Sequence, residues 1–219
     1  MRSYTNVIFD LDGTLLNTEA GIVKSLCAMT QKVGLPNIPL FDCSRFIGPP
    51  IERGLCDYFR LTNEEAEKYA IVFRDIYRNN FLFEASLYEG IIELLKCLSG
   101  REIELAIATY KRHDYAKEVI EHFGLNRYCT PCYGSDSVIL KTKSDIIKKC
   151  ISEMHVAEDS IVYVGDTIHD LQGAHEAGID FIGVSWGFGF NIATANYGIQ
   201  LARSTDDLFC KILGGAIND

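Results

Sequence analysis

Short apolar runs recur along the chain, separated by longer segments of mixed character. Short runs that are almost continuously hydrophobic are typical of parallel strands buried on both faces. We predict strands at Asn6–Phe9, Ile103–Ala108, Cys129–Tyr133, Ile161–Val164 and Phe181–Val184, the third being the weakest. Helix-like segments lie between them, at Gly90–Leu98, His113–Phe123, Ser144–Met154 and Leu171–Ala177. Strand alternating with helix predicts an α/β fold, in which helices cover both faces of a parallel sheet.

The stretch from residue 18 to residue 85 departs from this alternation, because it contains no convincing strand. Ile22, Leu26 and Met29 recur at helical spacing in a first amphipathic segment. A second segment, residues 63–80, has a charged, solvated face and a helix cap at Thr62 or Asn63. We therefore predict an all-α insert, residues 18–85, within an α/β domain formed by residues 1–17 and 86–219.

The composition is that of a folded protein without a broad basic surface. Of 219 residues, 47% are hydrophobic and 23% charged, and the formal net charge of -9 argues against binding to nucleic acid. No run approaches the roughly 18 apolar residues of a membrane span, and the N-terminus does not resemble a signal peptide. We expect a cytoplasmic protein, monomer or homodimer, that binds no membrane.

Eight cysteines are present, and without an export signal we expect reduced thiols. Cys129 and Cys132 form the one tight pair. A zinc or redox role would require a second half-site or a following helix, so we interpret this pair as structural.

Polar side chains gather where the predicted strands end. The first strand runs into Asp10-Leu11-Asp12-Gly13-Thr14, the second ends in Thr109, and the fourth ends in Gly165-Asp166 with Asp170 four residues on. Lys141 and Lys143 open the helix before that fourth strand. Because open α/β sheets bind ligands at the carboxyl ends of their strands, the sequence predicts one site at this edge.

The acidic residues suit phosphoryl transfer. Asp10 and Asp12 point the same way if the chain stays extended, so Asp10 can attack phosphorus while Asp12 handles the leaving-group proton. Carboxylates this close repel one another, so a cation is needed, and oxygen ligands favour Mg²⁺. Asp166 supplies a further carboxylate from a neighbouring strand.

The remaining residues suit the phosphoryl group itself. Gly13 permits a turn close to the phosphate, and Thr14 offers a hydroxyl or a backbone N–H. Thr109 and Lys143 are expected to hold the phosphoryl oxygens and neutralise their growing charge.

Asp10-Leu11-Asp12-Gly13-Thr14, Thr109, a lysine and Gly165-Asp166-Thr167-Ile168-His169-Asp170 together resemble the four-motif signature of the haloacid dehalogenase superfamily. Similar members are phosphatases with a Rossmann-like core and a small helical cap between the first two motifs, in the phosphoglycolate phosphatase and 5′-nucleotidase-like branch. The resemblance implies that Asp10 is the nucleophile and a magnesium ligand. It implies that Asp12 is the general acid and then the base, with its backbone carbonyl on the metal. It also implies that Asp166 ligates magnesium and that Asp170 supports the metal's water or the lysine.

Two assignments keep an alternative. Relatives usually place a proline directly after the motif lysine, and this chain does not. We favour Lys143, because the nucleotidase-like branch tends to read Thr-Lys, and Lys141 remains the alternative. Arg45 in the insert is a candidate substrate contact or else a solvated surface charge.

The predicted function is a magnesium-dependent phosphatase for a small phosphorylated metabolite, acting through an aspartyl-phosphate. Phosphoglycolate, nucleoside monophosphates and sugar phosphates all fit this description. The alternative is a phosphomutase of the β-phosphoglucomutase type, which would use Asp10 and Asp12 to move phosphate between positions on a sugar.

Trp186-Gly187-Phe188-Gly189-Phe190 follows the last predicted strand. The glycines indicate a jointed loop near the mouth of the site. We predict that its aromatic side chains pack against the protein rather than stack on a base.

Overall fold

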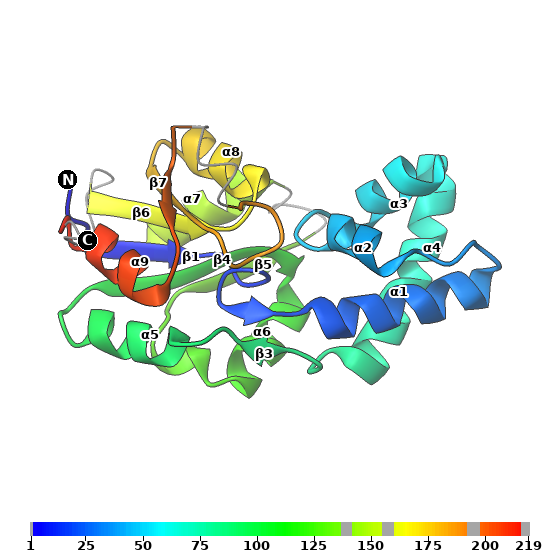
Figure 1. Cartoon of the computed structure of the whole chain (residues 1–219), viewed down its shortest axis with the longest axis horizontal. Helices are drawn as coiled ribbons and strands as arrows, with labels where there is room; N and C mark the ends of the chain where they lie inside the picture. The colour runs from blue at the N-terminus through cyan, green and yellow to red at the C-terminus, as the bar shows by residue number, and fades with distance from the viewer. Residues whose placement is uncertain (1, 137–141, 155–159, 192–197, 216–219) are drawn as a thin grey trace. The chain divides into compact units, whose positions relative to one another are not determined.

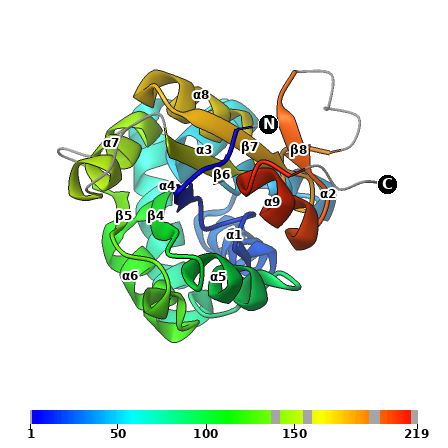
Figure 2. The same cartoon turned by 90° about the vertical axis from the view of Figure 1, so that its left-hand side faces the viewer.

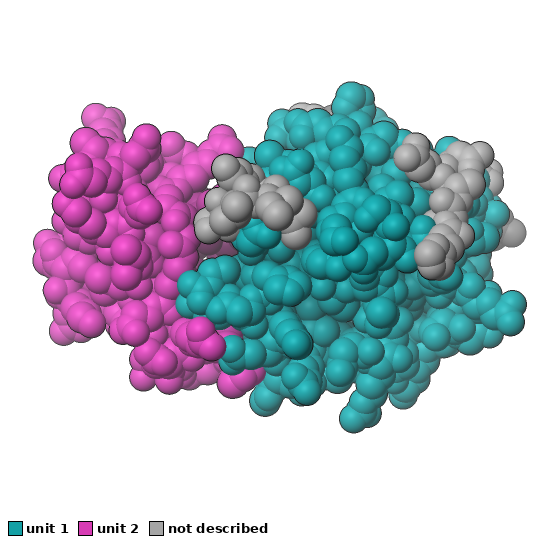
Figure 3. Space-filling model, turned by 180° about the vertical axis from the view of Figure 1, so that it is seen from behind, with its two compact units in different colours: residues 1–16, 87–219 teal, residues 17–86 magenta. Residues whose placement is uncertain are grey.

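The computed structural model describes residues 2–136, 142–154, 160–191 and 198–215. These form two compact units, residues 1–16 with 87–219 and residues 17–86 (Figure 3). The roles of catalytic core and cap for these units stay a prediction. Among the described residues, no helix combines the length and apolar character needed to cross a bilayer.

A six-stranded sheet organises the larger unit, in the order β5-β4-β1-β6-β7-β8. Its strand pairings are parallel, and β1 lies between β4 and β6. The strands are β1 (Asn6–Phe9), β4 (Glu104–Arg112), β5 (Cys132–Ser135), β6 (Ile161–Gly165), β7 (Asp180–Val184) and β8 (Gln200–Ala202). This arrangement confirms the predicted α/β fold with a parallel, Rossmann-like sheet.

Helices cover both faces of the sheet (Figures 1 and 2). Helices α7 and α8 pack together on one face, and α5, α6 and α9 lie on the other. Their bounds are α5 (Ile91–Ser99), α6 (His113–His122), α7 (Lys143–Glu153), α8 (Ile168–Ala177) and α9 (Thr205–Ile212), with a short 3-10 helix at Leu125–Arg127. Every residue of β1 and β6 is buried, because helices cover the sheet on both sides.

The core beneath α7 and α8 joins the sheet to both helices. Ile8 of β1, Tyr163 of β6 and Ala174 of α8 are fully buried in one cluster with Ile146 and Ile147 of α7. This packing holds the start of α7 and the start of α8 against the carboxyl ends of β1 and β6.

The smaller unit is helical. It contains α1 (Glu19–Val33), α2 (Leu40–Cys43), α3 (Ile51–Phe59) and α4 (Asn63–Ile76), a 3-10 helix at Ser44–Phe46 and a π-helical turn at Tyr77–Phe81. Thr62 caps α4 in a reciprocal capping box with Glu65, as expected of Thr-x-x-Glu. Two short strands, β2 (Leu16–Asn17) and β3 (Ser86–Leu87), pair where the chain passes between the units.

The structure corrects two predicted boundaries and adds two elements. The second predicted strand does not end at Thr109, because β4 continues to Arg112 beside β5 through a register irregularity. Helix α8 begins at Ile168 rather than Leu171, because Thr167 and Asp170 form a capping box that starts it. Strand β8 and helix α9 were not predicted. Their sequences are short, and β8 owes its strand conformation to pairing with β7.

Candidate active site

Three aspartates meet at the carboxyl edge of the sheet. Asp10 follows β1, Asp166 follows β6, and Asp170 lies in the first turn of α8. One carboxylate oxygen from each lies within 4.8 Å of the others, and all three residues are at most 2% exposed. Adjacent parallel strands bring Asp10 and Asp166 together, because Phe9 pairs with Val164.

Lys143, the first residue of α7, inserts its ammonium between two of these carboxylates. Its Nζ lies 2.8 Å from Oδ1 of Asp10 and 2.8 Å from Oδ1 of Asp170. The Lys143 side chain is itself buried. The predicted motif lysine therefore reaches the cluster, whereas the alternative, Lys141, lies outside the described residues.

Tyr163 of β6 helps to hold Lys143 in position. Its hydroxyl accepts a hydrogen bond from Lys143 at 3.2 Å and donates one to the carbonyl oxygen of Ala108 at 2.6 Å. The ring of Tyr110 lies 4.9 Å from the ammonium on another side. The lysine is thus anchored to β4 and β6 as well as to the aspartates.

Burial and crowding shape the acidity of this cluster. Burial raises the pKa of Asp10 to about 7, against the opposing pull of the Lys143 ammonium. Burial, followed by repulsion from Asp170 and Asp10, raises the pKa of Asp166 well above its usual range. Burial alone would lower the pKa of Lys143, but Asp10 and Asp170 outweigh it and raise that pKa. The lysine therefore stays charged.

The donor set fits a small, hard cation. Oδ2 of Asp170 accepts hydrogen bonds from the backbone and hydroxyl of Thr167, at 2.9 and 2.7 Å. Oδ1 of Asp170 is buried and lies 2.8 Å from the Lys143 ammonium. Three carboxylates whose oxygens lie within reach of one ion match the all-oxygen coordination of Mg²⁺.

Asp12 has a separate partner, Lys111, which the sequence reasoning missed. The Lys111 ammonium lies 2.9 and 3.0 Å from the two carboxylate oxygens of Asp12, and both side chains are largely buried. Lys111 lies two residues after Thr109 on the extended end of β4. The i, i+2 spacing used for Asp10 and Asp12 could have identified it.

Gly13 and Thr14 lie against Asp166. Gly13 has a φ of +89°, and a Cβ there would lie 2.3 Å from Oδ2 of Asp166, so only glycine fits. The Thr14 hydroxyl is 3.5 Å from Oδ1 of Asp166. From the sequence we predicted that Gly13 and Thr14 would lie close to a phosphate. In the structure they lie close to the carboxylate of Asp166.

Thr109 is buried at the same end of β4. Its hydroxyl accepts a hydrogen bond from the backbone N–H of Lys111 at 3.1 Å. Arg45 belongs to the other unit, where its side chain is 70% exposed and pairs with Asp42 at 3.2 Å.

Burial also marks the cysteine pair as unreactive. Cys129 and Cys132 are free thiols, and burial raises the pKa of Cys132 to about 11. A thiol that resists ionisation is a poor nucleophile and metal ligand.

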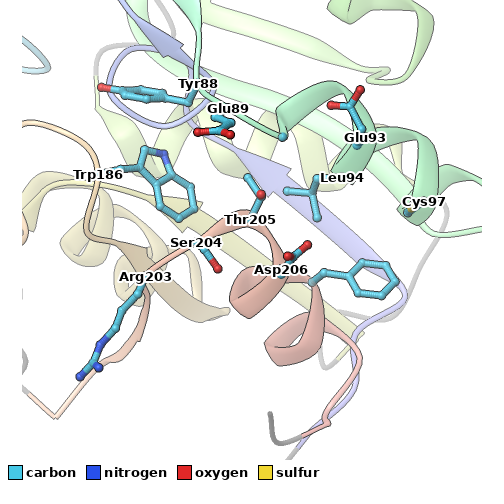
Figure 4. Close-up of a pocket in the computed structure, with 12 residues that line it drawn as sticks. Tyr88, Glu89, Glu93, Leu94, Cys97, Trp186, Arg203, Ser204, Thr205 and Asp206 are labelled. Carbon is cyan, nitrogen blue, oxygen red and sulfur yellow. The ribbon is translucent and has the colours of Figure 1, made fainter. Parts of the chain in front are cut away.

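A cavity of about 800 Å³ lies elsewhere on the larger unit, between α5 and α9 (Figure 4). Glu89, Glu93, Arg203 and Asp206 line it, with Trp186 at one end. None of the three clustered aspartates reaches this cavity. We place the chemistry at the convergent buried carboxylates, because the cavity acids are exposed and lack such an arrangement.

The chain is similar to several known proteins. Residues 7–184 match the model of the family described as haloacid dehalogenase-like hydrolase. The chain is 33% identical to a 5′-nucleotidase of Pseudomonas aeruginosa over 85% of each protein. It is 32% identical to the tyrosine-protein kinase PtkA of Mycobacterium tuberculosis, over 92% of this chain and 70% of PtkA. A predicted phosphatase from Clostridium acetobutylicum superposes with a TM-score of 0.90 at 32% identity, over 97% of this chain and 100% of that one.

Proposed function

Because the chain belongs to the haloacid dehalogenase-like hydrolase family, we propose that it is a Mg²⁺-dependent phosphatase that forms an aspartyl-phosphate on Asp10. The chain is a phosphoric monoester hydrolase by its kinship to proteins named 5′-nucleotidase and predicted phosphatase. The observation that carries the proposed chemistry is the buried cluster of Asp10, Asp166 and Asp170 with Lys143 between two of them.

In the proposed first step, a carboxylate oxygen of Asp10 bonds to phosphorus as the bond to the ester oxygen breaks. Asp12 donates a proton to that leaving oxygen. Water then attacks the phosphorus of the aspartyl-phosphate, Asp12 accepts a proton from this water, and Asp10 is released as a carboxylate with inorganic phosphate.

Asp10, Asp166 and Asp170 would hold the magnesium ion, with the backbone carbonyl of Asp12 as a further ligand. When bound, the ion would neutralise the crowded carboxylates and the phosphoryl oxygens. Lys143 holds Asp10 in place and offers its charge to those same oxygens, and Thr109 adds a hydroxyl beside them.

The proposed reaction requires Lys111 to release Asp12. Its ammonium contacts both carboxylate oxygens of Asp12. A substrate phosphate at this edge would compete for the ammonium and free Asp12. Lys111 would therefore move from Asp12 to the substrate during turnover.

The proposed substrate is a small phosphorylated metabolite. The relative named 5′-nucleotidase supports nucleoside monophosphates as the first compounds to test, with phosphoglycolate and sugar phosphates beside them. Thr14 and Lys143 are the candidate contacts in the larger unit, and a substrate contact by Arg45 stays a prediction.

The test is release of inorganic phosphate with Mg²⁺ from a panel of nucleoside monophosphates, phosphoglycolate, sugar phosphates and pyrophosphate. We expect one preferred ester. Phosphate exchange on a sugar that needs a bisphosphate primer, without net release, would instead establish the mutase.

Metal removal tests the cofactor separately. Excess chelator should abolish phosphate release, and added Mg²⁺ should restore it, because the crowded carboxylates need a counter-charge. Full activity in chelator would refute the magnesium assignment.

A further inference from the structure

The loop from Trp186 to Phe190 packs directly against Asp166 of the acidic cluster. The backbone N–H of Phe188 donates to Oδ2 of Asp166 at 2.7 Å, and the N–H of Phe190 donates to the Asp166 carbonyl at 2.7 Å. One carboxylate oxygen of Asp166 is thereby held by the loop, while the other lies near Thr14.

The two glycines of the loop make this approach possible. A Cβ at Gly187 would lie 2.4 Å from Oδ2 of Asp166 and 2.4 Å from the carbonyl oxygen of Gly13. A Cβ at Gly189 would lie 2.6 Å from the Asp166 carbonyl oxygen. Neither glycine has the left-handed φ that favours glycine, so space rather than backbone conformation demands them.

Trp186 ties the same loop to the residues after β1. Its indole N–H donates to the carbonyl oxygen of Thr14 at 3.1 Å. The loop therefore contacts both sides of the site, residues 13–14 and Asp166. Its aromatic ring also lines the cavity between α5 and α9 (Figure 4).

We propose that the Trp186–Phe190 loop is the positioning element of Asp166, which aims one carboxylate oxygen of that residue at the metal. Phe188 acts through its backbone, and Gly187 and Gly189 act by leaving room. This inference rests on the proposed metal site, but its test measures metal binding and not phosphate release.

The decisive variant is Gly187→Ala, with Mn²⁺ as the probe. Free Mn²⁺ is counted by electron paramagnetic resonance, which gives a Kd for folded protein. We expect the Kd to rise at least tenfold, because the added methyl group displaces the Asp166 carboxylate. Gly215→Ala is the matched control, since its Cβ meets nothing closer than 3.7 Å, and its Kd should stay within twofold of wild type. An unchanged Kd in Gly187→Ala would overturn the proposal.

Trp186 provides a second measurement that needs no loop variant, because it is the only tryptophan of the chain. Titration of wild type with Mg²⁺ should change its fluorescence, and Asp166→Asn should abolish the change. Constant fluorescence at saturating metal would overturn the proposal even if Gly187→Ala does not fold. Metal binding without ester hydrolysis would refute the proposed function alone and leave this inference standing.

Discussion

The larger unit contains two groups of acidic residues that carry the same charge but differ in burial and in their contacts. Asp10, Asp166 and Asp170 are at most 2% exposed, and a buried lysine pairs with two of them, Asp10 and Asp170. Glu89, Glu93 and Asp206 line a cavity of about 800 Å³ and are exposed to solvent. Charges in water are screened and cost little, whereas buried charges persist only when partners hold them. We therefore base the proposed location of the chemistry on burial with mutual contact rather than on concavity.

The largest expected effect comes from the buried group. Asp10→Asn removes the attacking carboxylate oxygen and should lower kcat for phosphate release by more than about a hundredfold, because no other group takes over as the nucleophile. Steady-state kinetics on the preferred ester measures it, with circular dichroism to show that the fold is intact. Residual activity above about a hundredth of wild type would exclude Asp10 as the nucleophile.

The buried lysine should matter most for stability. Lys143→Met leaves Asp10 and Asp170 without their shared cation and should lower the free energy of unfolding by about 3–5 kcal/mol. Lys149→Met on the same helix is the matched control, because Lys149 pairs with Glu153 at the surface and its loss should lower the free energy of unfolding far less. Urea denaturation measures both. Equal losses would show that burial does not distinguish the two ion pairs.

Lys111 should give an intermediate effect on catalysis. Lys111→Met removes the charge that holds Asp12 and should lower kcat/KM roughly tenfold, a fraction of what a general acid supplies. Lys111→Arg keeps the charge and should recover part of the loss. A pH profile of kcat/KM that is identical in Lys111→Met and wild type would argue against any coupling to Asp12.

The cavity acids should give the smallest effect. Glu93→Gln should leave kcat within twofold and the free energy of unfolding within about 0.5 kcal/mol, as for an ordinary surface substitution. A loss of activity comparable to that of Lys111→Met would show that the cavity takes part in function, and would remove the distinction between the two groups.

Local sequence patterns predicted those features of the fold and the site that local physics controls. Strand β1 matched its apolar run, and Asp10, Asp166 and Asp170 fell at the edge where parallel strands end. The same reasoning did not extend to Asp12, whose carboxylate pairs with Lys111 across 99 residues of sequence. Strand β8 was missed because its pairing with β7, and not its own composition, makes it a strand.

By itself, the sequence determined the alternation of strands and helices, the place of the helical insert and the residues that gather at one edge. These follow from side-chain periodicity and from the geometry of parallel strands. Only the tertiary structure decided which lysine pairs with which carboxylate. It alone also showed that position 187 has no room for a side chain larger than that of glycine. Those outcomes depend on distances between segments far apart in the chain, such as β4 beside β1 and the Trp186–Phe190 loop on Asp166. No local pattern encodes such distances, because packing of the whole unit sets them.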